Sequence, residues 1–260
     1  MSISVTDRIR RLQGQLNLDQ DGIIGPATLT ALERVVSGAN DEKAHAGFSV
    51  IASRSGIGAL IRFEISTPAY YRRNLTHPVW PGGNSGITIG IGYDVGYSSV
   101  AQIRRDWRGV IPDRKLDLIT GVAGLKGKAA RAALWRLRNV SISLEQARTV
   151  FYRSTLPVYA QKTRRAYAGI EKLPADAQSM LLSLVYNRGA RMSGSRRREM
   201  KNIKSLVKKG DIDGIAAEVR SMTRLWDASE LPGLHNRRQE EAKKISKSQR
   251  AYDWQELIFI

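Results

Sequence analysis

Residues 86–97 read GITIGIGYDVGY, and this run constrains the fold more than any other feature of the chain. Apolar side chains alternate with glycines there, a pattern typical of two short strands joined by a tight turn. Elsewhere, apolar residues recur at helical spacing. Helices are expected over 50–65, 143–153, 196–208, 212–225 and 235–249. The sequence therefore predicts a mainly α fold, an α+β arrangement with one small β-hairpin.

Composition narrows the class of protein further. Hydrophobic residues make up 42% of the 260, enough for a packed core. Cysteine is absent, which excludes disulfides and thiolate metal sites, and the three histidines lack metal-ligand spacing. We expect no metal and no cofactor. The start of the chain lacks the pattern of a signal peptide, and no apolar run is long enough to span a membrane.

The positive charge is strong and uneven. The formal net charge is +18, yet residues 1–47 contain five basic and six acidic residues, so the whole excess lies after residue 47. Such a surface attracts polyanions, including nucleic acid, teichoic acid, lipopolysaccharide and anionic peptidoglycan. The chain shows no known nucleic-acid-binding motif, so a specific nucleic-acid partner is not expected.

A composition change marks a domain boundary. Residues 37–47 read SGANDEKAHAG, which is small, polar and aperiodic, as in a linker. The sequence predicts a small helical module over 1–37, a linker over 38–47 and a main domain over 48–260.

The small module contains a recognisable motif. Leu12-Gln13 is followed by DGIIGPAT at residues 21–28. Taken alone, Asp21-Gly22 is a turn between two helices. Together these positions resemble the peptidoglycan-binding modules joined to many cell-wall hydrolases. The resemblance implies contacts with peptidoglycan from four residues: Asp21, Gly22, Gly25 and Thr28.

The main domain carries a second resemblance. The run from Thr88 to Asp94, TIGIGYD, resembles the core motif of the phage-type lysozymes (glycoside hydrolase family 24-like), in which Thr-x-Gly-x-Gly lies on a hairpin lining the cleft. In that family a glutamate precedes the motif at the end of the first helix of the domain, and Glu64 is the one acidic residue of IGALIRFEIS. The familiar members have an aspartate before the threonine, but residues 65–87 contain no acidic residue. The pesticin-like muramidases match better, with an aspartate six residues after the threonine.

The resemblance covers about residues 60–250 and implies a mechanism. Glycoside hydrolysis needs one carboxyl group as general acid and a second as base or nucleophile. Glu64, on an apolar helix that favours its protonated form, would be the acid, Asp94 the base, and Thr88 would hold the attacking water. An inverting reaction would place the carboxyl groups roughly 6.5–9.5 Å apart. Further substrate contacts are expected from Gly90, Gly92, Tyr93 and Asn187.

The segment LPGLHNRRQEEAKKI, residues 231–245, resembles a stretch near the end of these domains. We expect it to be structural. Arg237 and Glu241 are four residues apart, a spacing typical of an exposed ion pair on a helix.

These resemblances imply a modular bacteriophage endolysin. It would be made in the bacterial host's cytoplasm without a signal peptide, reach the wall after release with the help of a holin, and act as a monomer. It would hydrolyse the bond between N-acetylmuramic acid and N-acetylglucosamine, and its basic surface would approach lipopolysaccharide or the outer membrane. Three alternatives remain open: a lytic transglycosylase acting on the same bond, a bacteriocin or virion-associated muramidase, and a non-enzymatic basic cell-wall binder.

Overall fold

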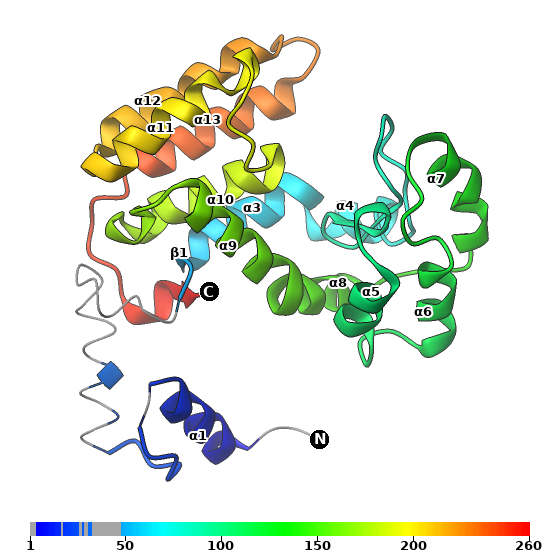
Figure 1. Cartoon of the computed structure of the whole chain (residues 1–260), viewed down its shortest axis with the longest axis horizontal. Helices are drawn as coiled ribbons and strands as arrows, with labels where there is room; N and C mark the ends of the chain where they lie inside the picture. The colour runs from blue at the N-terminus through cyan, green and yellow to red at the C-terminus, as the bar shows by residue number, and fades with distance from the viewer. Residues whose placement is uncertain (1–3, 17, 26–27, 29–30, 33–47) are drawn as a thin grey trace. The chain divides into compact units, whose positions relative to one another are not determined.

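The computed structural model describes residues 4–16, 18–25, 28, 31–32 and 48–260 (Figure 1). The predicted linker over 38–47 and most of the second helix expected near residue 26 lie outside this part of the chain. The described residues form two compact units, one of residues up to 54 together with 162–260, the other of residues 55–161. None of the described helices is both long and apolar enough to cross a membrane.

The unit of residues 55–161 holds the predicted hairpin. The chain enters it in α3 and leaves it in α9. Its elements in chain order are α3 (Arg54–Ile65), α4 (Pro68–Asn74), β2 (Thr88–Ile89), β3 (Tyr93–Asp94), the 3-10 turn η2 (Val95–Tyr97), α5 (Val100–Trp107), α6 (Asp113–Thr120), α7 (Gly127–Ala133), η3 (Leu134–Leu137), α8 (Leu144–Val150), the π-helical turn η4 (Phe151–Thr155) and α9 (Leu156–Ala166).

The second unit is built around a buried helix. Its elements are α1 (Val5–Gln15), β1 (Ile51–Ser53), η5 (Ile170–Lys172), α10 (Ala175–Arg188), η6 (Ser195–Arg197), α11 (Arg198–Lys209), α12 (Ile212–Ser221), η7 (Met222–Leu225), α13 (Pro232–Ser246), η8 (Trp254–Glu256) and β4 (Leu257–Phe259). Helix α10 is buried from Ala175 to Val185. Helix α12 packs against α11 and α13, and α13 also packs against α10.

The mainly helical prediction is confirmed, and the expected hairpin is present as β2 and β3. Ser143 and Gln146 form a capping box at the start of α8, which begins where the helix over 143–153 is expected. This helix continues past its expected end through η4 into α9. Pro157 lacks an N–H and crowds the preceding turn, and a π-helical turn immediately before it accommodates that change.

Two expectations are wrong. The helix expected over 50–65 begins only at Arg54, because Ile51–Ser53 form β1, which pairs antiparallel with β4 in a second small sheet. Since the partner strand lies some two hundred residues away, no local periodicity indicates this pairing. The ion pair of Arg237 and Glu241 is buried rather than exposed, with side chains 4% and 0% accessible. Burial follows because α13 packs on both α10 and α12.

Candidate active site

The hairpin places two of the predicted catalytic residues directly opposite each other. In its antiparallel register, Thr88 pairs with Asp94 and Ile89 with Tyr93. The turn between them uses Gly90 and Gly92, at φ +59° and +66°, a left-handed backbone that favours glycine. Thr88 is also fixed on its other side by Val79, with N–H···O distances of 2.7 and 3.0 Å. The Thr88 side chain is therefore held at a defined position beside Asp94.

The Asp94 carboxylate is anchored by backbone. Its Oδ1 accepts a hydrogen bond from the Gly96 N–H at 2.8 Å, and its Oδ2 accepts one from the Gly86 N–H at 3.2 Å. A Cβ at Gly86 would collide with this carboxylate and with the backbone of Gly96. The carboxylate remains partly exposed. It is thus pre-oriented and still accessible, as a general base must be.

Glu64 lies in the last turn of α3. This helix buries an apolar face, including Ile57, Leu60 and Ile61, and Glu64 is half-buried beside it. Burial of this apolar face holds α3 in place, and the Glu64 carboxyl group lies at the border between the buried face and the exposed face of the helix.

Tyr159, on α9, is half-buried and feels the charge of both acids. Burial raises the pKa of its hydroxyl, and the negative charges of Glu64 and Asp94 raise that pKa further. Electrostatic interactions of this kind decay with distance, so both carboxylates lie within electrostatic range of this hydroxyl. The structure thus pairs Thr88 with Asp94 and places Glu64 and Asp94 within electrostatic range of Tyr159, and the catalytic roles of these residues stay predictions.

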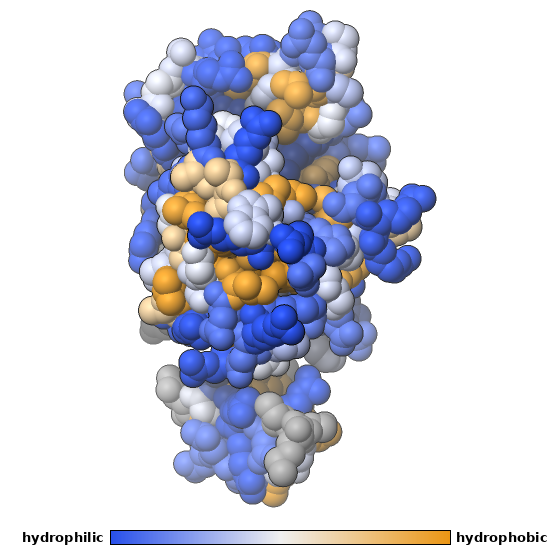
Figure 2. Space-filling view, turned by 90° about the vertical axis from the view of Figure 1, so that its right-hand side faces the viewer, coloured by the Kyte–Doolittle hydropathy of each residue, from blue (hydrophilic) through white to orange (hydrophobic). Residues whose placement is uncertain are grey.

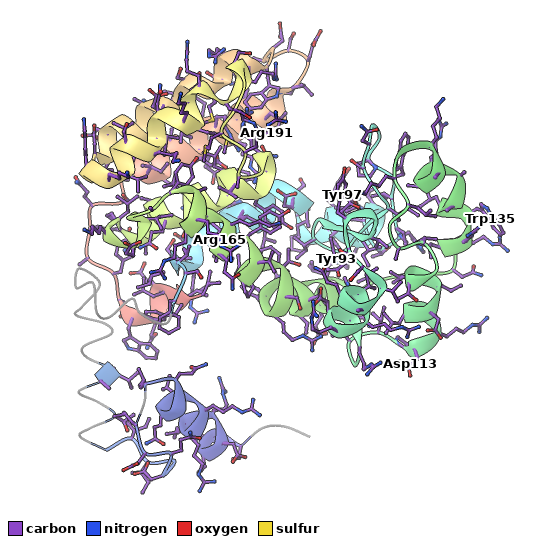
Figure 3. The ribbon with its side chains drawn as sticks, viewed as in Figure 1. Tyr93, Tyr97, Asp113, Trp135, Arg165 and Arg191 are labelled. Carbon is purple, nitrogen blue, oxygen red and sulfur yellow. The ribbon has the colours of Figure 1, made fainter. Side chains whose placement is uncertain are left out.

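Sequence reasoning missed Tyr159. Its segment, LPVYAQK, has the appearance of an ordinary apolar helix face, and the two acids are far away in the sequence. Tyr97 was missed as well. It follows Asp94 in η2, is 64% exposed, donates from its hydroxyl to the Asn84 carbonyl at 3.2 Å and lies under the Lys126 ammonium (Figure 3).

Tyr93, predicted as a substrate contact, is a buried residue of the hairpin that packs against α5. Its ring is buried and packs edge-to-face on Trp107, with centroids 5.5 Å apart. Its hydroxyl donates to Asp106 Oδ2 at 2.9 Å. Burial is the main cause that raises the pKa of this hydroxyl. Gly92 is exposed and Gly90 partly exposed, so the turn itself faces solvent.

Asn187 belongs to the other compact unit. It is exposed near the end of α10, and its Oδ1 accepts from Arg238 Nη2 at 3.5 Å. Its contact with substrate stays a prediction.

The motif of the small module organises a turn around Gln13, which is 1% exposed. Gln13 Nε2 donates to Asp21 Oδ1 at 2.6 Å and to Thr28 Oγ1 at 3.0 Å, while its Oε1 accepts from the Gly22 N–H at 2.8 Å. The pKa of Asp21 is lowered mainly by the hydrogen bond from the Ile23 N–H and next by the hydrogen bond from the Gln13 side chain. Gly22 has φ +79°, whereas Gly25 lies at negative φ and is partly exposed. The motif residues thus fix the turn, and their contacts with peptidoglycan stay predictions.

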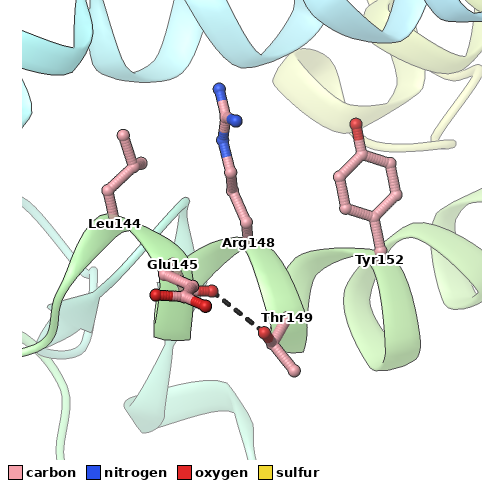
Figure 4. A pocket seen from close by; sticks show the side chains of 5 residues that line it. All are labelled: Leu144, Glu145, Arg148, Thr149 and Tyr152. Atoms are coloured by element: carbon pink, nitrogen blue, oxygen red, sulfur yellow. Dashed lines mark hydrogen bonds between the residues drawn. The ribbon is translucent and has the colours of Figure 1, made fainter. Parts of the chain in front are cut away.

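One hollow in the unit of residues 55–161 is not lined by any of the predicted catalytic residues. A hollow of about 460 Å³ lies along α8 and η4 (Figure 4), and neither Glu64, Thr88 nor Asp94 lines it. It is lined by Leu144, Glu145, Arg148, Thr149 and Tyr152. Within the described ranges, no group of three or more acidic or histidine side chains is arranged to hold a metal ion.

The exposed face of the molecule is mixed in character. Figure 2 shows apolar side chains gathered in a patch and bordered by hydrophilic ones. Exposed aromatic rings such as Trp135, at 63% accessibility, present apolar area next to charge.

Comparison with known proteins adds one family. A family model described as "Domain of unknown function (DUF8812)" matches residues 63–239. The match includes Glu64, Thr88 and Asp94 and leaves out the small module. No curated protein matches the chain.

Proposed function

The chain belongs to the family described as a domain of unknown function (DUF8812), and we propose that it is a peptidoglycan hydrolase with a lysozyme-like catalytic domain. It cleaves the bond between N-acetylmuramic acid and N-acetylglucosamine. The observation that supports this most is that two carboxylates, Glu64 and Asp94, both act electrostatically on the half-buried Tyr159, with Thr88 opposite Asp94 in the hairpin. Paired carboxylates are what glycoside hydrolysis requires.

The proposed roles follow from the surroundings of each group. Glu64, beside an apolar helix face, protonates the leaving oxygen. Asp94, anchored by the N–H groups of Gly86 and Gly96, takes a proton from water as that water attacks the anomeric carbon. The Thr88 hydroxyl orients this water. The glycosidic C–O bond breaks, the glycan leaves with the proton from Glu64, and the new hydroxyl comes from water.

Tyr159 is a positioning residue in this proposal. A tyrosine hydroxyl is protonated at neutral pH, and burial followed by the two negative charges raises the pKa of Tyr159 further, so it adds no third negative charge near the acids. As a neutral hydrogen-bond donor and acceptor, this hydroxyl helps to orient the carboxyl groups.

The rest of the chain fits an endolysin. The small module would hold the enzyme on the wall, and the positive charge after residue 47 would favour encounter with an anionic envelope. Release from a bacterial host with the help of a holin, monomeric action and contact with lipopolysaccharide belong to the same proposal.

Digestion of purified peptidoglycan tests the proposal. Wild type should release soluble fragments, and Glu64→Gln should reduce the rate by about 10²- to 10⁴-fold because the general acid is lost. Glu145→Gln is the matched control, since Glu145 is an exposed carboxylate in the same unit and should leave the rate unchanged. Equal rates for wild type and Glu64→Gln would contradict the assignment, and a lack of digestion by wild type would favour a binding protein.

One observation favours a second reaction. Asp94 caps the 3-10 turn η2 through the Gly96 N–H, which is a structural task. If that is its whole task, one acid remains, and a single acid/base suffices for a lytic transglycosylase. Asp94→Asn separates the two: the hydrolase loses activity, whereas the transglycosylase keeps most of it.

A further inference from the structure

Four arginines gather on the segment between α10 and α11. They are Arg188, Arg191, Arg196 and Arg197. Gly189 and Gly194, at φ +72° and +100°, allow this segment to change direction, so that side chains distant along it come together. Arg191, labelled in Figure 3, and Arg196 are exposed, while Arg188 and Arg197 are half-buried.

The arginines are held in place by neutral groups. Arg188 Nη2 donates to the Arg196 carbonyl, and the Arg188 guanidinium lies 5.0 Å from the centre of the Trp226 ring. Arg196 Nη2 donates to the Leu225 carbonyl at 3.2 Å, and Arg191 Nε donates to Ser193 Oγ at 2.8 Å. These bonds fix the guanidinium groups without neutralising their charge.

The neighbouring acids are already engaged. Glu199 binds Arg224 at 2.6 Å and Arg198 at 3.2 Å. Glu241 binds Arg237 at 3.1 Å and Arg238 at 2.9 Å. These two acids each have two cationic partners of their own.

No acidic side chain in the described part of the chain forms an ion pair with any of the four arginines. Burial lowers the pKa of Arg188 to about 10, and the like charges of Arg197 and Arg238 contribute to that shift. Burial, followed by the charge of Arg191, also lowers the pKa of Arg197. In addition, Arg188 Nε is buried and has no hydrogen-bond partner. An anion bound among these guanidinium groups would offset their mutual repulsion.

We propose that residues 188–197 form a binding site for one phosphate group. A phosphate presents several oxygens, which suits guanidinium groups that approach from different positions, whereas a carboxylate offers two oxygens that a single arginine can satisfy. Residues 188–197 contain no aromatic side chain, and the neighbouring Trp226 ring already faces the Arg188 guanidinium, which disfavours stacking of nucleic-acid bases at this site. The phosphate is either free or part of an envelope lipid. This site does not require the hydrolysis proposed above.

Titration calorimetry of the full chain with inorganic phosphate tests the site. Wild type should bind phosphate saturably with one site per chain. Arg191→Gln/Arg197→Gln should weaken this binding at least about tenfold, because two charged donors are lost. The matched control is Arg114→Gln/Arg136→Gln, which removes the same charge from two exposed arginines elsewhere. It should change the affinity less than about twofold, since only the screened long-range field changes.

Vesicles identify the source of the phosphate. Binding to phosphatidylcholine vesicles containing phosphatidic acid, lost in Arg191→Gln/Arg197→Gln, would support the site and assign it to a lipid phosphate. Binding of inorganic phosphate alone would support a soluble ligand.

Three results would overturn the proposal. These are absence of saturable phosphate binding, equal loss of affinity in both double variants, and arginine-dependent binding of a single-stranded oligonucleotide without binding of phosphate. If circular dichroism shows that the double variant is unfolded, the exposed Arg191→Gln alone should weaken phosphate binding about threefold, and an unchanged affinity would count against the site.

Discussion

At the residue scale, Asp94 combines two tasks in one side chain. It anchors the backbone of Gly86 and Gly96, and it faces Thr88 across the hairpin. The sequence shows that Asp94 follows a glycine-rich turn. It does not indicate that the N–H of Gly86, eight residues earlier, donates a hydrogen bond to the Asp94 carboxylate. Hydrogen bonds of this kind depend on the folded path of the chain, so they could not be predicted.

We expect Asp94→Asn to lower the rate of peptidoglycan digestion by about 10²-fold or more, since an amide cannot accept the proton of water. The amide keeps one acceptor oxygen, so the free energy of unfolding should fall by only about 1–2 kcal/mol. Digestion assays beside urea denaturation measure both quantities. A fully active, equally stable variant would remove Asp94 from the mechanism.

Tyr159→Phe tests the positioning role. The substitution keeps the ring and removes the hydroxyl near Glu64 and Asp94. The maximal rate should fall about tenfold and the pH profile of that rate should shift, because a neutral hydroxyl within electrostatic range of both acids is lost. A lower stability with an unchanged pH profile would show that Tyr159 has only a structural role.

At the element scale, the hairpin illustrates what a sequence can predict. Its turn depends on Gly90 and Gly92, which adopt positive φ, and this preference is a local property of glycine. The alternation of glycine with apolar residues over 86–97 therefore indicates the hairpin from the sequence alone. The pairing of β1 with β4 and the burial of Glu241 depend on distant segments, and both escaped local reasoning. The same limit applies to Tyr159.

Gly90→Ala should damage the hairpin more than a comparable change elsewhere. Its Cβ would lie 3.1 Å from the Ala147 Cβ and 3.3 Å from the Trp107 ring, and the φ of +59° is unfavourable for alanine. Gly109→Ala is the control, because Gly109 also has positive φ, +74°, but open space around it. Backbone strain should cost each variant about 1–2 kcal/mol of unfolding free energy, and only Gly90→Ala should also lose digestion. Equal effects in both would argue against tight packing under the turn.

Helix α4 offers a test in alkaline solution. The buried Tyr71 donates from its hydroxyl to the Ile142 carbonyl at 3.2 Å, and burial raises the pKa of Tyr71 from 10.0 to about 12. Because the folded pKa is the higher one, this contribution to stability is complete below pH 10 and is lost as the pH rises toward 12. It amounts to roughly 2–3 kcal/mol. Denaturation of Tyr71→Phe should show a shallower loss of stability over this range, and a slope equal to that of wild type would contradict the explanation.

At the scale of the whole molecule, the uneven charge predicts how binding to the cell wall depends on salt, and this binding can be measured apart from catalysis. The positive excess lies after residue 47, whereas residues 1–47 are slightly acidic. The Glu64→Gln variant, which we expect to be inactive, should therefore bind purified cell walls less strongly at about 1 M salt than at about 0.1 M, since screening shortens the range of the field from about 10 Å to about 3 Å. Cosedimentation measures this. Binding that is independent of salt would assign wall attachment to uncharged contacts.

The most direct test of the central proposal is mass spectrometry of the products from purified peptidoglycan, with wild type beside Glu64→Gln. Hydrolysis by a muramidase predicts fragments with ordinary reducing N-acetylmuramic acid ends from wild type and almost none from the variant. Anhydro-muramic ends would contradict hydrolysis and identify a lytic transglycosylase. Intact glycan strands after treatment with wild type would contradict glycan cleavage altogether.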